Sequence, residues 1–288
     1  MAVSSFDITA PDNCEHVISN QSVSEVGAFT FTAGLPPSGY FGETIGNATL
    51  NTSAIILGRF YPSHFCATVG ALTNRTDANT AAGCTDGFSY LDEEFTLNTT
   101  LTAQAFGTAC NAGGITTNYS GAWSQFANPF VENTSIGNEN GKWNFAAVNN
   151  PATTPVDLSA RVQINTTTSS GGFSNGQAAL TTHLKLSRAG IAPSYTAETP
   201  LSNVHIAINP LDNDNVDLSN TNLTISGQTF FDAGTTALFF GRLIAENAYG
   251  TNGPKTPLDM YARTQYCNAA SAGSCTDWQT KSDDSCTL

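Results

Sequence analysis

The chain has 288 residues, of which 40% are hydrophobic and 10% aromatic, so it holds enough apolar material for a sizeable core. Only 11% of the residues are charged and the net charge is −13, which disfavours nucleic acid and anionic membrane surfaces as partners. Lys, Arg and Met are scarce while Thr, Ser, Asn and Gly are abundant. This composition argues against helical bundles and solenoids.

Apolar and polar residues alternate in many short segments, which is typical of strands with one wet face. In chain order these segments are 29–32, 95–103, 156–165, 180–187, 204–208 and 258–263. Segment 156–165 alternates strictly over ten residues and predicts a single strand. Segment 237–244 is apolar on both faces and predicts a central strand covered on both sides.

The strands are separated by clusters of Pro, Gly, Ser and Asn, which are typical of turns, and no long helical periodicity is present. We therefore expect an all-β chain of antiparallel, immunoglobulin-like β-sandwiches, two in tandem, with little helix. A strand pattern ends within 58–65, where Pro62 would break it. This predicts a sandwich or partial sandwich domain at 1–62 and a larger sandwich domain at 63–288.

The seven cysteines do not have the spacing of a zinc site, because none forms a CxxC pair and histidines are few. Scattered cysteines in such a chain are typical of disulfides formed in an oxidising compartment. The number is odd, and the first residues lack the features of a signal peptide. We therefore expect a fragment of a longer exported protein, located at the cell surface or outside the cell.

Two disulfides are predicted from local loop closure. Cys66 and Cys84 flank one short segment rich in Gly, Thr and Asn, and Cys267 and Cys275 flank another. Closing a short loop costs little chain entropy. The remaining cysteines have no assigned partner and are Cys14, Cys110 and Cys286.

Acidic residues at 92–94 offer three neighbouring carboxyl groups, and a pair of carboxyls could support glycoside hydrolysis. Neighbours on a strand point to opposite faces, so a solvated turn is the better interpretation. His183 and His205 lie on polar faces of predicted strands, where histidine is usually solvated. Neither GxSxG nor HExxH nor a P-loop occurs. We expect no enzyme activity and assign no catalytic residue.

The loop 212–217 is the segment most like a binding site, because five of its six side chains carry oxygen. It is not an EF-hand, since Leu218 follows Asp217 where that motif needs glycine. We expect weak Ca²⁺ binding by Asp212, Asp214 and Asp217 and no other cofactor. The alternative is a polar Asx-turn.

Aromatic side chains could stack on sugars, but in an all-β chain they are more often part of the core, which we favour here. The residues in question are Trp123, Trp143, Trp278, Tyr40, Tyr119 and Tyr249.

Several motifs occur together in a characteristic order. They include VGAFTF at 26–31, GRFYPSHF at 58–65, LTAQAFG at 101–107 and FGRLIAENAYG at 240–250. As a set they resemble the MshQ-like domain of large bacterial proteins associated with the mannose-sensitive haemagglutinin pilus cluster. That family usually reads D-x-D-G-V in the acidic loop, whereas Asn215 stands in place of the glycine here. The resemblance implies export and a cell-surface or pilus-associated role, and it implies no catalytic residue and no ligand.

These observations favour a structural or adhesive module of a large exported bacterial surface or pilus-associated protein. Its expected partners are other domains of the same long chain, pilus or surface components, and glycans. Nucleic acid and membrane insertion are not expected, because the chain has a net charge of −13 and no apolar stretch of spanning length. The alternative function is a carbohydrate-binding module or a carbohydrate-active enzyme.

Overall fold

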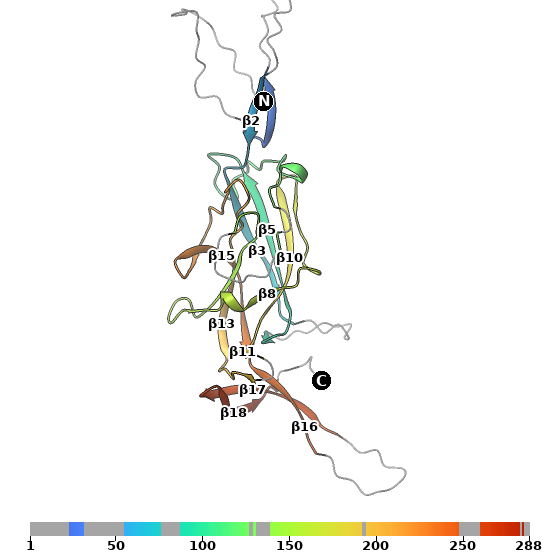
Figure 1. Cartoon of the computed structure of the whole chain (residues 1–288), viewed down its shortest axis with the longest axis vertical. Coiled ribbons are helices and arrows are strands. Elements are labelled where there is room, and N and C mark those ends of the chain that lie inside the picture. The colour runs from blue at the N-terminus through green and yellow to red at the C-terminus, as the bar shows by residue number, and fades with distance from the viewer. Residues whose placement is uncertain are drawn as a thin grey trace, which may run out of the picture.

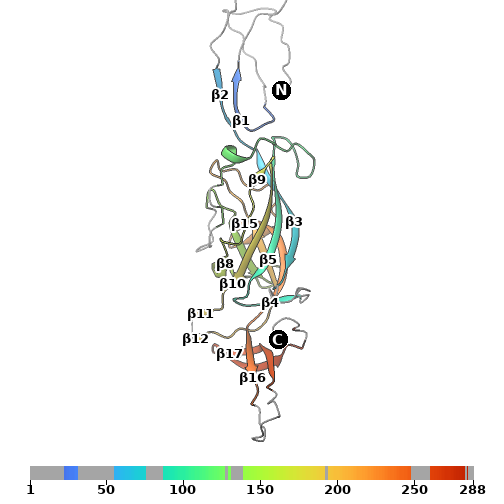
Figure 2. The same ribbon diagram turned by 90° about the vertical axis from the view of Figure 1, so that its right-hand side faces the viewer.

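The computed structural model describes residues 23–31, 55–75, 87–126, 129–130, 139–191, 194–247, 260–282 and 284. Almost all of its regular structure is β, and nearly every strand pair is antiparallel (Figures 1 and 2). The two 3-10 helices described, η2 (Gly121–Trp123) and η3 (Ser159–Arg161), are single turns. The prediction of an all-β chain with little helix is confirmed.

The first large sheet is built around three long antiparallel strands. Its order is β3-β5-β10-β8, and β9 pairs with β10. The bounds are β3 (His64–Thr73), β5 (Phe95–Gln104), β10 (Gln177–Leu186), β8 (Val162–Ile164) and β9 (Phe173–Ser174). Burial alternates along β5 and β10 as the predicted segments 95–103 and 180–187 require.

The second large sheet has the order β14-β15-β13-β6-β7, and β4 pairs with β15 in parallel. The bounds are β14 (Leu223–Ile225), β15 (Gln228–Phe239), β13 (Leu201–Ile208), β6 (Phe145–Asn149), β7 (Val156–Asp157) and β4 (Phe88–Tyr90). Every residue of β6 is buried, because β6 lies between β13 and β7 in this sheet.

One hydrophobic core fills the space between the two sheets. It combines Leu97 and Leu184 of the first sheet with Ile206 and Leu238 of the second, all completely buried. Packing apolar faces of two sheets against each other defines a β-sandwich.

Small sheets lie at the two ends of the sandwich (Figures 1 and 2). At one end β1 (Gly27–Phe31) pairs with β2 (Ile55–Phe60). At the other, β16 (Gly241–Ala245), β17 (Ala262–Ser271) and β18 (Ser274–Thr280) form a three-stranded sheet. A short ribbon joins β11 (Gly190–Ile191) to β12 (Ser194–Tyr195). The part of the chain described thus contains one sandwich with small flanking sheets, where the sequence predicts two sandwiches in tandem. The boundary between 1–62 and 63–288 stays a prediction.

The prediction of one strand over 156–165 was wrong. Val156–Asp157 forms β7 in the second sheet, and after the η3 turn Val162–Ile164 forms β8 in the first. The Ser159 hydroxyl makes hydrogen bonds with both the N–H and the carbonyl of Ala147, which hold the turn against β6. Leu158, Val162 and Ile164 are buried, whereas both residues of β7 are exposed, so the alternating residues do not share one strand face.

The prediction of a central strand over 237–244 was also wrong. Strand β15 ends at Phe239 and β16 begins at Gly241 in a different sheet, where Leu243 is 59% exposed. Segment 258–263 is described only from residue 260, and β17 starts at Ala262. Two apolar segments that follow each other in the chain but belong to different sheets therefore resemble a single buried strand in the sequence.

Two disulfides are present in the described residues. Cys267 is joined to Cys275, the pair that the sequence predicts. Cys66 is joined to Cys110, so the prediction of Cys84 as its partner was wrong. Cys66 lies on β3, which pairs with β5, and the chain turns back after β5 so that Cys110 returns to β3. The pairing of β3 with β5 therefore brings together two cysteines that are 44 residues apart in the sequence. Cys84 lies outside the described residues.

Candidate functional site

The acidic loop is organised around the fully buried Asp212. Its Oδ1 accepts backbone N–H groups from Asp214 at 2.8 Å and Val216 at 2.9 Å, and its Oδ2 accepts the Tyr119 hydroxyl at 2.6 Å. Burial raises the pKa of the Asp212 carboxyl, and these three hydrogen bonds oppose that rise. Burial and the bond to Asp212 raise the pKa of Tyr119. Asp212 thus serves as the centre of an Asx-turn.

The other two predicted calcium ligands point elsewhere. Asp214 forms an ion pair with Arg59 of β2, and Asp217 is exposed. Among the described residues, the carboxyls of Asp212, Asp214 and Asp217 do not form a cluster with metal-ligand spacing. Calcium binding by this loop stays a prediction, and the hydrogen bonds of Asp212 favour the alternative of a polar turn.

The acidic run 92–94 lies in the turn and short link before β5, and its three carboxyl groups have different partners. Asp92 bonds to Arg188, with its Oδ2 3.4 Å from Nε. Glu93 accepts the backbone N–H of Tyr90 at 2.9 Å. Glu94 lies 3.0 Å from Nδ1 of His183. Three acids with three separate partners do not make a carboxyl pair for glycoside hydrolysis.

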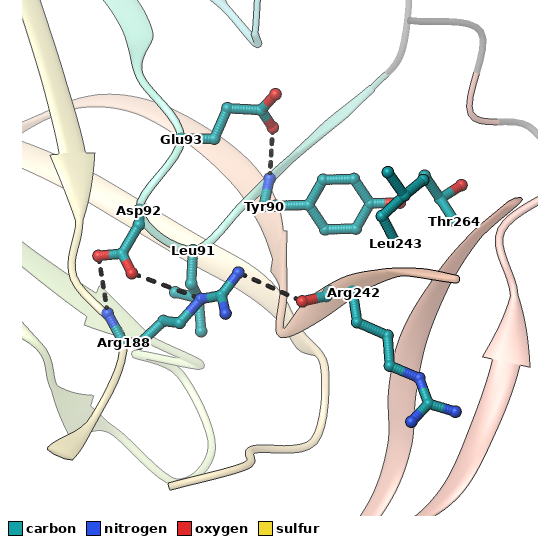
Figure 3. A pocket seen from close by; sticks show the side chains of 9 residues that line it. Tyr90, Leu91, Asp92, Glu93, Arg188, Arg242, Leu243 and Thr264 are labelled. Carbon is teal, nitrogen blue, oxygen red and sulfur yellow. Dashed lines mark hydrogen bonds and ion pairs between the residues drawn. The ribbon is translucent and has the colours of Figure 1, made fainter. Parts of the chain in front are cut away.

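A pocket of about 370 Å³ lies where the sandwich meets the C-terminal sheet (Figure 3). It is lined by Tyr90, Leu91, Asp92, Glu93, Arg188, Gly241, Arg242, Leu243 and Thr264. Gly241 is required here because a Cβ on it would collide with the Tyr90 ring. The chain therefore enters β16 in close contact with the sandwich.

The polar groups of this pocket bond to one another. Arg188 donates its backbone N–H to Asp92 and its Nη2 to the carbonyl of Gly241, at 3.2 Å each (Figure 3). Its guanidinium also lies over the Phe240 ring. Burial raises the pKa of Glu93, against the lowering effect of the nearby Arg75. Internal pairing of this kind is typical of a structural joint between two parts of a fold.

Most of the aromatic residues considered for sugar stacking belong to the core, which confirms that interpretation where the structure describes them. Trp143 and Tyr119 are completely buried, and Trp143 stacks on Phe126 with ring centroids 4.1 Å apart. Trp278 is partly buried and packs beneath the Arg242 guanidinium at 3.8 Å. Tyr40 and Tyr249 lie outside the described residues.

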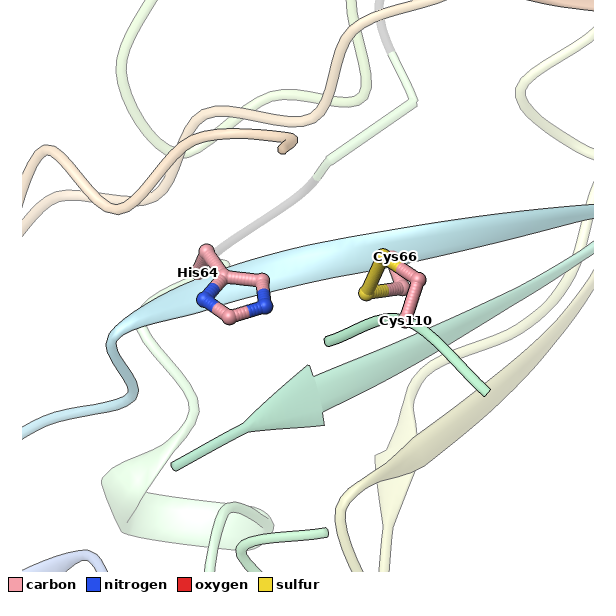
Figure 4. Close-up of side chains that lie close together, drawn as sticks. All are labelled: His64, Cys66 and Cys110. Carbon is pink, nitrogen blue, oxygen red and sulfur yellow. A yellow bond between two sulfur atoms is a disulfide. The ribbon is translucent and has the colours of Figure 1, made fainter. Parts of the chain in front are cut away.

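A cluster that the sequence reasoning missed surrounds the Cys66–Cys110 disulfide. His64 lies two residues before Cys66 on β3, and the imidazole and both sulfurs approach within 4.8 Å of one another (Figure 4). The available signal was the H-x-C spacing, which places both side chains on one face of a strand. The third member comes from a separate segment and could be found only through the sheet pairing.

Comparison with known proteins gives one family. The family model described as "DUF6701, third domain" matches residues 25–237, which are 213 of the 288 residues. The match includes both large sheets except the last two residues of β15. No curated protein and no solved structure matches the chain. The matched region also runs across the predicted boundary at 62–63.

Proposed function

This chain belongs to the DUF6701 third-domain family, and from that premise we propose that it is a structural module of a large exported bacterial surface protein. The family description names a third domain, so other domains of the same long chain are the proposed partners. A pilus-associated or adhesive role is part of the proposal and rests on the sequence resemblance to MshQ-like proteins. We propose no catalytic activity, because the acids at 92–94 bind separate partners.

The observation that carries this proposal is the arrangement of the sheets along one axis. The first described strands, β1 and β2, lie at one end of the sandwich, and β16–β18 lie at the other (Figure 2). The long strands β3, β5 and β10 run along this axis between them. A force along the chain would therefore act parallel to the strands and load many ladder hydrogen bonds together.

Covalent and surface features support the same role. Two disulfides close loops within the described residues, as suits an oxidising environment outside the cytoplasm. Within the described residues, the helices are too short and too polar to span a bilayer. The chain has few charged residues and many Thr, Ser and Asn side chains, which form hydrogen bonds at small desolvation cost.

Single-molecule pulling tests this proposal. With handles at Ser63 and Leu243, the force shears the sandwich along its strands. With handles at the exposed Thr68 of β3 and Thr224 of β14, the force separates the two sheets instead. We expect a clearly larger mean unfolding force for the first geometry. Equal unfolding forces, or a larger force for the second geometry, would contradict the proposed role as a structural module that resists force along its strands.

A glycan-binding measurement tests the alternative of a carbohydrate-binding module. We expect the folded chain to show no saturable retention on immobilised glycans, since Trp143 and Tyr119 are buried and Arg242 covers one face of Trp278. Saturable binding that is lost in Trp278→Ala would replace the structural proposal with the carbohydrate one.

A further inference from the structure

The cluster around the Cys66–Cys110 disulfide combines three metal-ligating side chains in one place. His64 and Cys66 project from the same face of β3, and Cys110 reaches them from the loop after β5 (Figure 4). Among the described residues, this is the group of three His, Cys, Asp or Glu side chains whose ligand atoms all lie within 4.8 Å of one another. The disulfide of this cluster stabilises the fold in its oxidised form, and the inference concerns the reduced form.

The His64 imidazole takes no part in the side-chain hydrogen bonding of the described residues. It is half-buried beside the disulfide and, within the described part of the chain, makes no hydrogen bond or ion pair. The other two histidines described in strands bond to carboxylates, His183 to Glu94 and His205 to Asp232. An unpaired imidazole next to two sulfurs has a free nitrogen lone pair for a metal ion.

A serine completes the surroundings of the two sulfurs. The Ser219 hydroxyl lies 3.2 Å from Sγ of Cys110 and 3.7 Å from Sγ of Cys66. Its backbone N–H donates to the carbonyl of Phe65 at 3.0 Å, which fixes it against β3. A hydroxyl in this position can donate to a thiolate and stabilise its charge, as partners around metal-bound ligands do.

We propose that the reduced form of this cluster is a binding site for a thiophilic divalent metal ion of the Zn²⁺ class, with His64, Cys66 and Cys110 as ligands. A dithiol reductant transfers two electrons and two protons to the disulfide, giving two thiols, and is itself oxidised to a disulfide. Metal binding then releases the two thiol protons to solvent and leaves two thiolates and one neutral imidazole on the ion. Water takes the fourth position, which is the usual arrangement of an open zinc site.

The geometry needs only a small movement. For tetrahedral Zn²⁺ with bonds of about 2.3 Å to sulfur and about 2.0 Å to nitrogen, the ligand atoms lie roughly 3.5–3.8 Å apart. The imidazole nitrogen lies within 4.8 Å of both sulfurs, and opening the disulfide lets the sulfurs separate. Cys66 is held on β3, whereas Cys110 lies in a turn outside the regular strands, so Cys110 is the ligand that would have to shift. The oxidised and metal-bound forms therefore exclude each other.

Cobalt binding provides the test, because Co²⁺ takes zinc sites and reports thiolate ligands by charge-transfer absorption. The full chain carries Cys14→Ser, Cys84→Ser and Cys286→Ser to remove other thiols, and a phosphine reductant opens the disulfides without oxygen. We expect one Co²⁺ per chain with a thiolate charge-transfer band and the visible bands of tetrahedral cobalt, displaced by Zn²⁺. The oxidised chain is expected to bind none.

The second disulfide supplies a matched control. Cys66→Ser with Cys110→Ser should abolish the absorption, whereas Cys267→Ser with Cys275→Ser should leave it unchanged. His64→Ala should weaken Co²⁺ affinity by at least about tenfold while keeping the oxidised fold, which its far-UV spectrum checks. The metal should also raise the thermal midpoint of the reduced chain, since only the folded state assembles the ligands.

Several outcomes would overturn the inference. These are the absence of a thiolate band in the reduced chain, a band that persists without Cys66 and Cys110, an affinity unaffected by His64→Ala, and a bound metal that leaves the thermal midpoint unchanged. The last two would show coordination by an unfolded cysteine pair instead of a built site. None of these results depends on the structural role proposed above, so that role is tested separately by pulling.

Discussion

Replacing Asp212 by alanine tests whether the acidic loop is a structural turn. The substitution removes an acceptor from the Tyr119 hydroxyl and from two backbone N–H groups, all around a fully buried side chain. An unsatisfied buried donor costs about 1–3 kcal/mol, and the loop can relax to hydrate some of them. We expect the free energy of unfolding to fall by about 3–5 kcal/mol, which is a large part of a typical total of about 5–15 kcal/mol.

Urea unfolding of Asp212→Ala, Tyr119→Phe and the double variant measures how the two side chains cooperate. Since they share a 2.6 Å hydrogen bond, we expect a coupling energy of about 1–2 kcal/mol. Independent, additive effects would refute the description of the loop as a turn anchored on Tyr119.

The pH dependence gives a second check with a definite sign. The folded-state pKa of Asp212 lies above its ordinary value because burial disfavours the charged form. Its contribution to stability is therefore fully present below the ordinary pKa of aspartate and decreases as the pH rises through the folded-state pKa. As the pH rises through that pKa, we expect the free energy of unfolding of the wild type, minus that of Asp212→Asn, to decrease. A difference that grows with pH would contradict the buried, desolvated carboxyl.

Calcium separates the turn from the ion-binding alternative. A turn held by hydrogen bonds loses the same stability on Asp212→Ala in millimolar Ca²⁺ and in chelator. If Ca²⁺ raises the thermal midpoint of the wild type and Asp212→Ala with Asp214→Ala abolishes that shift, the folded state binds the ion and the turn interpretation is wrong.

Three further outcomes follow from the packing. Reducing the Cys66–Cys110 disulfide frees a segment of 44 residues. The contour length gained when the chain is unfolded by pulling should therefore increase by roughly 150 Å, at about 3.5 Å per residue. An unchanged contour length would show that the two cysteines are not bonded. Asp284→Ala removes one ion-pair partner of the buried Arg75 guanidinium, which also lies 3.6 Å from Glu93, and should cost about 1–3 kcal/mol in urea unfolding. No measurable loss would contradict a stabilising pair between Arg75 and Asp284. Gly176→Ala places a Cβ against a backbone carbonyl at a φ of +74° and should cost about 2–4 kcal/mol in thermal or urea unfolding, so a neutral effect would contradict the close approach.

Local pattern in the sequence determines which residues form the central strands. Segments 95–103 and 180–187 alternate because a strand turns successive side chains to opposite faces, and one face of each lies on the core. Composition likewise excludes helical folds, since propensity depends on the residues themselves.

Only the tertiary structure decided which elements meet. Alternation reports that a face is buried but not which sheet buries it, so segment 156–165 reads as one strand although it crosses between two sheets. Cys66 finds Cys110 through the pairing of β3 with β5, and Asp212 finds Tyr119 across 93 residues. Hydrogen bonds and packing act over a few ångströms in space, whatever the distance along the chain. Contacts between remote segments are therefore fixed by the fold and not by the local sequence on either side.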